Sequence, residues 1–118
     1  MRWIMPLFLC FAAAGAAAEN WQLRPGDTPF AQAELQALPG QSFQFFDGGE
    51  SQYGRNGAYA YTYSAENGGG TAWGTYRIAR DGSICVDFTN GFNRCDLYVR
   101  NGARVILVTQ KGERFPVR

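Results

Sequence analysis

The chemistry open to this chain is limited by the absence of histidine from its 118 residues. Without histidine, neither a Ser-His nor a Cys-His pair can activate a nucleophile. Two carboxylate pairs, Asp47 with Glu50 and Asp87 with Asp96, have the residue types of a glycosidase acid and base. They lie beside turn residues or near Arg94, where carboxylates are usually solvated or paired. We therefore predict no catalytic residues and no enzymatic activity.

Metal and cofactor motifs are missing as well. Nine residues lie between Cys85 and Cys95, a spacing unlike that of zinc ligands, and no CxxC occurs. Residues 47–50, with the sequence DGGE, lack the alternating acidic ligands of a calcium loop. The glycines at 68–70 precede a predicted strand, whereas a phosphate-binding glycine loop leads into a helix. We expect neither a metal nor a cofactor.

The two cysteines Cys85 and Cys95 flank Asn90-Gly91, a pair that favours a tight turn because both residues tolerate a positive φ. A three-residue loop over residues 89–91 sets three pairs opposite one another: Phe88 with Phe92, Val86 with Arg94, and Cys85 with Cys95. Directly opposed residues of this kind have Cα atoms about 4.5 Å apart, which a disulfide can span. We predict a β-hairpin with a Cys85–Cys95 disulfide; two free buried thiols are the alternative.

The N-terminus has the pattern of a secretory signal peptide. Arg2 gives it a positive start, residues 3–14 form an apolar run too short to span a membrane, and residues 16–18 are a small-residue cleavage site. We predict cleavage after Ala18, which removes Cys10 and leaves the two hairpin cysteines. The leucine before Cys10 argues against a lipoprotein signal. The predicted destination is the periplasm, an oxidising compartment in which a disulfide persists.

We predict three segments: the signal peptide at 1–18, an N-terminal segment with a short helix at 19–40, and an antiparallel β domain at 41–118. Removal of Arg2 takes the formal net charge from +1 to zero. The mature chain therefore has no general preference for nucleic acid or anionic membranes. Its composition predicts no transmembrane span after residue 18.

A helix is predicted from Thr28 as N-cap and Pro29 as first helical residue. Apolar residues follow at helical spacing as far as Leu38, and the Pro-Gly pair at 39–40 ends it. We expect this amphipathic helix to pack against the sheet.

The β domain is predicted from short alternating runs separated by turn glycines. These glycines are Gly57, Gly68, Gly82, Gly91, Gly102 and Gly112. Their regular spacing predicts a mainly β fold: an antiparallel meander of about six to seven short strands, forming a barrel or a folded-over sandwich. Strands are expected over residues 42–46, 58–64, 71–79 and 104–110, besides those of the stapled hairpin.

Three tyrosines at alternate positions share one face of their predicted strand: Tyr59, Tyr61 and Tyr63. An even-length loop pairs them with Ile78, Tyr76 and Gly74, whereas an odd-length loop pairs them with Arg77, Thr75 and Trp73. Hydrophobic matching favours the even loop, which places the tyrosines in the core and the other three residues on the outer face. Trp73 and Arg77 are then candidate ligand contacts. For Trp73, packing under the loop at 66–70 is the alternative.

Three short stretches carry a resemblance. They are residues 73–78 (WGTYRI), residues 81–86 (DGSICV) and Cys95. In them the chain resembles a group of small exported Gram-negative bacterial proteins of unknown function, over roughly residues 38–117. Their pattern is a G-x-[WY] strand, a D-G turn, an apolar-Cys-apolar strand and a second cysteine. The resemblance implies a periplasmic β-protein and no particular activity. More distantly, the layout looks like small periplasmic β-barrel inhibitors of lysozyme or metalloproteases.

Together these patterns favour a non-enzymatic periplasmic binding or interaction module. Its partner is expected to be an envelope protein, a glycan or a small ligand. The alternative is a small periplasmic inhibitor of a lysozyme- or protease-type hydrolase.

Overall fold

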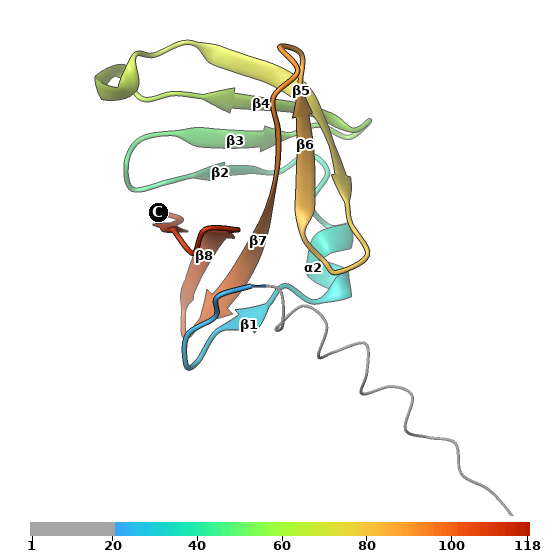
Figure 1. Cartoon of the computed structure of the whole chain (residues 1–118), viewed down its shortest axis with the longest axis vertical. Coiled ribbons are helices and arrows are strands. Elements are labelled where there is room, and N and C mark those ends of the chain that lie inside the picture. The colour runs from blue at the N-terminus through green and yellow to red at the C-terminus, as the bar shows by residue number, and fades with distance from the viewer. Residues whose placement is uncertain (1–20) are drawn as a thin grey trace, which may run out of the picture.

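A computed structural model describes residues 21–118, so the predicted signal peptide lies outside the described residues. The chain is mainly β, with strands that pair antiparallel in chain order from β2 to β9 (Figure 1). The strands and helices are β1 (Thr28–Pro29), α2 (Gln32–Gln36), β2 (Ser42–Gln44), β3 (Glu50–Tyr53), β4 (Ala58–Thr62), the 3-10 helix η1 (Ala65–Asn67), β5 (Thr71–Ile78), β6 (Ile84–Phe88), β7 (Asn93–Asn101), β8 (Arg104–Thr109) and β9 (Arg114–Pro116).

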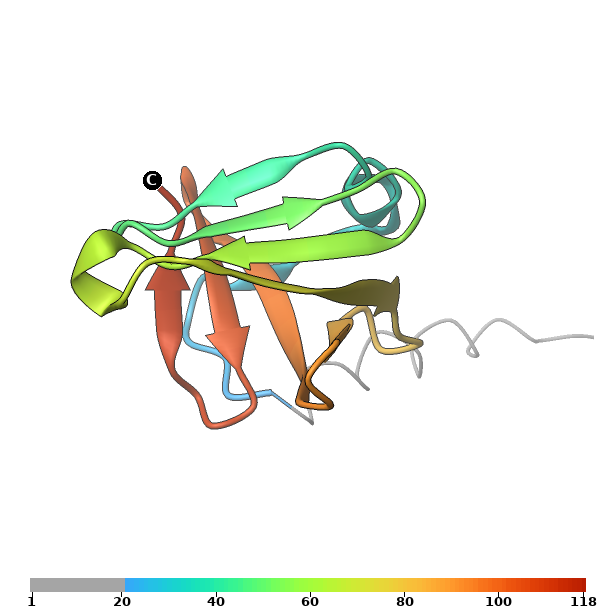
Figure 2. The ribbon, with the colours of Figure 1, turned by 90° about the horizontal axis from the view of Figure 1, so that it is seen from above.

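The sheet curls into a half-barrel, so that the green strands β2 to β4 lie across the orange and red strands β7 and β8 (Figure 2). Its two ends meet beyond β2 and β9, where Phe45 forms an isolated bridge with Val117. Eight strands follow one another in this path, more than the six to seven predicted. The additional strand is β3, whose residues are polar except for Tyr53 and show no apolar alternation.

The stapled hairpin is confirmed. Strands β6 and β7 pair Cys85 with Cys95 and Val86 with Arg94, and a disulfide joins the two cysteines. The loop closes through a hydrogen bond from the Phe88 amide to the Phe92 carbonyl, 2.8 Å. Gly91 takes a positive φ of 93°, as a three-residue loop of this kind requires.

The predicted start of the helix is wrong. Thr28 and Pro29 form strand β1, which pairs with Arg100 and Val99 of β7. The helix begins at Gln32, and Ala31 is its N-cap. Pairing with a distant strand satisfies the backbone here, and it overrides the local preference of a Thr-Pro pair for a helix start.

The faces of the tyrosine strand are as predicted, but its partners are not. Tyr59 lies opposite Gly74 and Tyr61 opposite Ala72, so the tyrosines do face even-numbered residues. The register is displaced by the loop, which runs from residue 63 to residue 70 and contains η1. Ser64 caps η1 by accepting a hydrogen bond from the Asn67 amide, 3.3 Å. This capped turn makes the loop longer than predicted, but the loop still has an even number of residues, so the tyrosines keep their face.

Two hydrophobic clusters lie on opposite faces of the curled sheet. The inner cluster consists of Leu35, Leu38, Phe45, Tyr53, Tyr59, Ile84, Val86, Tyr98 and Leu107. The outer cluster consists of Trp21, Leu97, Val99, Ile106 and Val108. The N-terminal segment therefore covers the outer face of β7 and β8, while α2 contributes Leu35 to the interior and the turn after it contributes Leu38.

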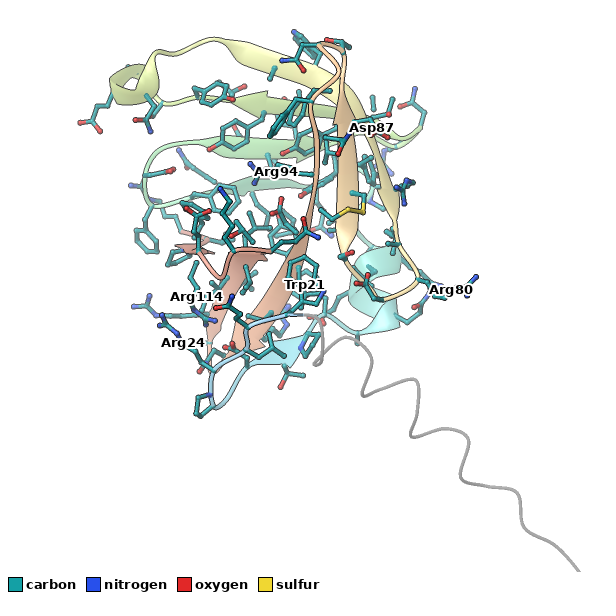
Figure 3. All side chains as sticks on the ribbon, viewed as in Figure 1. Trp21, Arg24, Arg80, Asp87, Arg94 and Arg114 are labelled. Carbon is teal, nitrogen blue, oxygen red and sulfur yellow. A yellow bond between two sulfur atoms is a disulfide. The ribbon has the colours of Figure 1, made fainter. Side chains whose placement is uncertain are left out.

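An ion pair holds the N-terminal segment in place. The fully buried Asp27 carboxylate accepts hydrogen bonds from Arg114 at 2.8 and 2.9 Å and from Asn101 at 2.8 Å. The Arg24 amide donates a further one, 2.7 Å. These bonds join the segment to β9 and β7, and Figure 3 shows Arg114 close to this segment. The hydrogen bonds from Arg114 hold the pKa of Asp27 well below its ordinary value.

Candidate ligand-binding cavity

A cavity of about 320 Å³ opens into the half-barrel. Its walls come from the seven strands β3 to β9 and from the loops after β2, β4 and β6. The residues lining it are Phe45, Asp47, Ser51, Tyr59, Tyr61, Tyr63, Asn67, Ala72, Phe88, Asn90, Phe92, Arg94, Leu107 and Phe115. The volume lies at the lower end of the range of about 300–1,000 Å³ typical of small-molecule sites, and half of the lining residues are aromatic.

Tyr59 and Tyr61 of β4, with Tyr63 directly after the strand, run from the core to the mouth of this cavity. Tyr59 is buried, Tyr61 is half-buried, and Tyr63 is 45 % exposed. The prediction that all three form core is therefore right for Tyr59 and wrong for Tyr63. Strand alternation correctly places them on one face, but that face is covered only where the half-barrel is filled.

A close contact with Gly49 positions Tyr61. A Cβ atom added to Gly49 would lie 1.9 Å from the Tyr61 hydroxyl oxygen, so only glycine allows this approach. The Gly49 amide in turn donates to the Asp47 carboxylate, 2.9 Å. Burial raises the pKa of Tyr61, so its hydroxyl stays protonated at neutral pH.

The floor of the cavity is closed by paired hydroxyl groups. Ser51 and Tyr59 share a hydrogen bond of 2.8 Å, and Tyr53 and Tyr98 share another of 2.8 Å below them. Burial raises the pKa of Tyr59 to about 12, and it also raises the pKa values of Tyr53 and Tyr98. These hydroxyls satisfy one another in the protonated state, which suits a structural floor better than an acid-base site.

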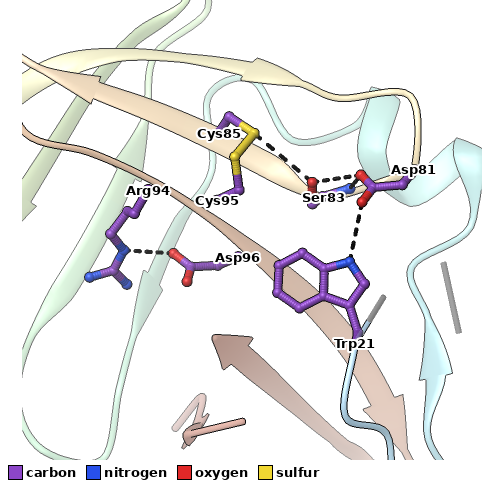
Figure 4. The surroundings of a disulfide bond; sticks show 7 residues. All are labelled: Trp21, Asp81, Ser83, Cys85, Arg94, Cys95 and Asp96. Atoms are coloured by element: carbon purple, nitrogen blue, oxygen red, sulfur yellow. Dashed lines mark hydrogen bonds and ion pairs between the residues drawn. A yellow bond between two sulfur atoms is a disulfide. The ribbon is translucent and has the colours of Figure 1, made fainter. Parts of the chain in front are cut away.

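Arg94 places a cationic group on the inner face of β7. Arg94, Asp96 and Tyr98 alternate along this strand and therefore share its inner face. The Arg94 Nε atom donates to an Asp96 carboxylate oxygen, 2.7 Å, and the two side chains are 43 % and 10 % exposed (Figure 4). Burial raises the pKa of Asp96, although the neighbouring Arg94 opposes that shift.

The hairpin tip forms one wall of the cavity. Phe88 and Phe92 both line it, with ring centroids 6.1 Å apart, and Phe92 is 59 % exposed. Asn90 fixes the tip by accepting a hydrogen bond from the Phe92 amide, 2.9 Å. The Cys85–Cys95 disulfide joins the same two strands further down, so it fixes the register of this wall.

The region around the disulfide also contacts the N-terminal segment. The Trp21 indole donates to Asp81, 3.2 Å, and the Ser83 hydroxyl donates to the other oxygen of that carboxylate, 2.6 Å (Figure 4). Burial opposes ionisation of Asp81, but the hydrogen bonds from Ser83 and Trp21 keep its pKa below the ordinary value. This network lies outside the cavity and ties the N-terminal segment to the β5–β6 turn.

The two candidate contacts predicted from the sequence lie elsewhere. Trp73 is opposite Ala60 and 62 % exposed, and Arg77 is opposite Cys85 and also exposed. They share the outer face of β5, and neither lines the cavity. The high exposure of Trp73 argues against its packing under the preceding loop. Its role as a ligand contact stays a prediction.

Three residues that line the cavity were not predicted as site residues: Arg94, Phe92 and the exposed Tyr63. The signal was available in part, because the predicted hairpin register already placed Arg94 opposite Val86 and Phe92 opposite Phe88. The sequence pattern does not reveal the curl of the sheet, which brings β4 over the hairpin.

Within residues 21–118 there is no group of three or more histidine, cysteine, aspartate or glutamate side chains arranged to hold a metal ion. None of the helices in that range has the length and apolarity needed to cross a membrane. Comparison with protein-family models, with curated proteins and with solved structures finds no match for this chain.

Proposed function

We propose that this chain is a non-enzymatic binding module of the bacterial periplasm, which takes a small ligand into the aromatic cavity. The observation that supports it is the cavity itself: aromatic walls, a hydrogen-bonded floor and a few polar groups at the mouth. Such a combination is typical of sites that bury an apolar ligand and orient it with a few polar contacts. The absence of histidine removes the commonest catalytic base but leaves binding unaffected.

Two further features support the proposal. The N-terminal pattern of Arg2, the apolar run and the cleavage site favours export, and the Cys85–Cys95 disulfide suits an oxidising compartment. The Phe45–Val117 bridge favours closure of the half-barrel into a barrel, an architecture that often holds ligands at its mouth.

The decisive experiment is a fragment screen read by amide chemical shifts of the mature protein. We expect small aromatic fragments to cause saturable shifts around the cavity, at the loop after β2, in β4 and at the hairpin tip. If saturable shifts occur only around Trp73 and Arg77, or nowhere, the cavity is not the binding site.

Two exposed aromatic residues give a matched pair of variants. Phe92 and Trp73 are 59 % and 62 % exposed, so replacing either by alanine should cost little stability. Phe92→Ala removes a cavity wall and should weaken fragment binding several-fold, whereas Trp73→Ala should leave it unchanged. The opposite order would favour the outer face of β5.

One observation favours inhibition of a hydrolase as a second candidate. The exposed Phe92 stands at the tip of a hairpin whose strands are joined by a disulfide, which is a rigid way to present an apolar side chain to another protein. Lysozyme and secreted-protease assays would distinguish the two functions. Inhibition that is lost in Phe92→Ala would support this candidate, and full hydrolase activity at saturating protein would exclude it for the enzymes assayed.

A further inference from the structure

The polar group in the cavity with the most unused bonding capacity is the Arg94 guanidinium. Its Nε atom donates to Asp96, but neither of its terminal nitrogens donates a hydrogen bond to any residue between 21 and 118. Arginine is always charged and presents these donors in a planar fork. Asp96, which shares the inner face of β7 with Arg94, fixes the orientation of the guanidinium by accepting the hydrogen bond from Nε.

The walls beside this fork are aromatic. Tyr61, Phe88 and Phe92 line the same cavity as Arg94, and the Tyr61 and Tyr63 rings meet edge to face with centroids 4.9 Å apart. A ligand with an apolar body can therefore lie against these rings while an anionic group faces the guanidinium. A planar carboxylate matches the fork with two parallel hydrogen bonds.

The charges around the fork restrict the ligand further. Asp96 balances the charge of Arg94, and Asp47 adds a negative charge to the lining. A dianion such as phosphate would meet repulsion that a single carboxylate largely avoids. Because long-range attraction is weak here, an apolar body is needed to supply most of the affinity.

We propose that the cavity binds a monocarboxylate with a ring-sized apolar body, and that Arg94 receives the carboxylate. This inference rests on the proposed binding function and names its ligand class. The carboxylate can belong to a free organic acid or to the C-terminal residue of a peptide, since both present the same group next to an apolar side chain.

The test compares 3-phenylpropionate with its uncharged isostere 3-phenylpropionamide and with acetate, by chemical-shift titration of the mature protein. We expect the acid to bind at least tenfold more tightly than the amide, because charge-assisted bidentate hydrogen bonds are stronger than neutral ones. Acetate, which has the charge without the ring, should give no saturable shift. Titration with N-acetylglycylphenylalanine then separates the sources: tighter binding than the free acid identifies a peptide C-terminus, and weaker binding identifies a small acid.

Substitutions at Arg94 test whether its guanidinium binds the carboxylate. Arg94→Gln leaves Asp96 buried and unpaired, so the double variant Arg94→Gln with Asp96→Asn is the safer test of a folded protein. In both variants the difference between acid and amide should disappear. Arg77→Gln, which removes an exposed arginine from the outer face, is the matched control and should keep that difference.

Equal affinity for acid and amide in the wild-type protein would overturn the carboxylate proposal and leave the binding function intact. An acid preference that survives the double variant would overturn the role of Arg94. No saturable shift with any of the probes would also overturn the proposed ligand class, while the fragment screen decides separately whether the cavity binds anything.

Discussion

At the scale of single residues, the contact between Gly49 and Tyr61 shapes the cavity. Gly49→Ala places a methyl group where the Tyr61 hydroxyl now lies, so we predict that the ring moves and that stability falls by about 1–3 kcal/mol. Ligand binding should weaken as well, because Tyr61 lines the cavity. Urea unfolding measures the loss, and Tyr61→Phe in the same background should restore part of it. An unchanged midpoint would contradict the close contact.

The paired tyrosine hydroxyls below the cavity floor allow a second test at this scale. Tyr53→Phe or Tyr98→Phe alone leaves the other hydroxyl buried without its partner, at a cost of about 1–3 kcal/mol. Removing both hydroxyls should cost less than the sum of the single changes. A double-mutant cycle by urea unfolding measures this coupling, and simple additivity would show that the two hydroxyls do not depend on each other.

At the scale of elements, the Cys85–Cys95 disulfide joins β6 and β7. Closing so short a loop should stabilise the fold by about 3 kcal/mol in the chain-entropy model. We predict that reduction lowers the melting temperature but leaves a folded protein, since the inner cluster draws on nearly every other element. Thermal melts with and without reductant test this, and a thiol assay on the denatured, unreduced mature protein should find no free thiol.

The N-terminal segment depends on a different link, the buried Asp27–Arg114 pair. Asp27→Asn leaves the Arg114 charge unpaired, and we predict a loss of about 3 kcal/mol. Because the pKa of Asp27 is lowered in the folded state from its ordinary value of 3.8, its contribution is present above that pH and is lost as the pH falls through the lower folded value.

Urea melts across the acid range therefore provide the check on Asp27. The wild-type protein should lose stability below about pH 4 more steeply than Asp27→Asn, and the two should converge at the lowest pH. Asp96 acts in the opposite sense: its raised pKa favours the folded state at low pH, and that contribution is lost as the pH rises through the folded value. Parallel curves of unfolding free energy against pH for the wild-type protein and Asp27→Asn would contradict this role of the Asp27–Arg114 pair.

At the scale of the whole molecule, the sequence predicted what is decided locally. The hairpin follows from Asn90-Gly91 and two cysteines at matching distances, and the faces of β4 follow from strand alternation. Strand β1 was missed because it exists only through its pairing with Arg100 and Val99, more than half the chain away.

The cavity was missed for the same reason, because Tyr61 of β4 meets Phe92 and Arg94 of the β6–β7 hairpin only when the sheet curls. Tyr63 illustrates the limit most directly. Its alternation with Tyr59 and Tyr61 was correctly interpreted, but only the position of the mouth determines that it is exposed. Periodicity thus fixes a direction for each side chain, and the depth of burial depends on long-range closure.

The bridge between Phe45 and Val117 has a consequence for the rate and order of folding. The Phe46 amide bonds to the Pro116 carbonyl and the Arg118 amide to the Gln44 carbonyl, so the two ends of the half-barrel are joined by residues that are synthesised far apart in time. The hairpin, whose contacts are local, can form early, whereas this seam bears the largest loop-closure entropy and should form last. Native-state hydrogen exchange should then find the Phe46 and Arg118 amides exchanging through low-energy openings, well before those of β6 and β7. Completion of the curled sheet would therefore wait until residues 116–118 pair with residues 44–46.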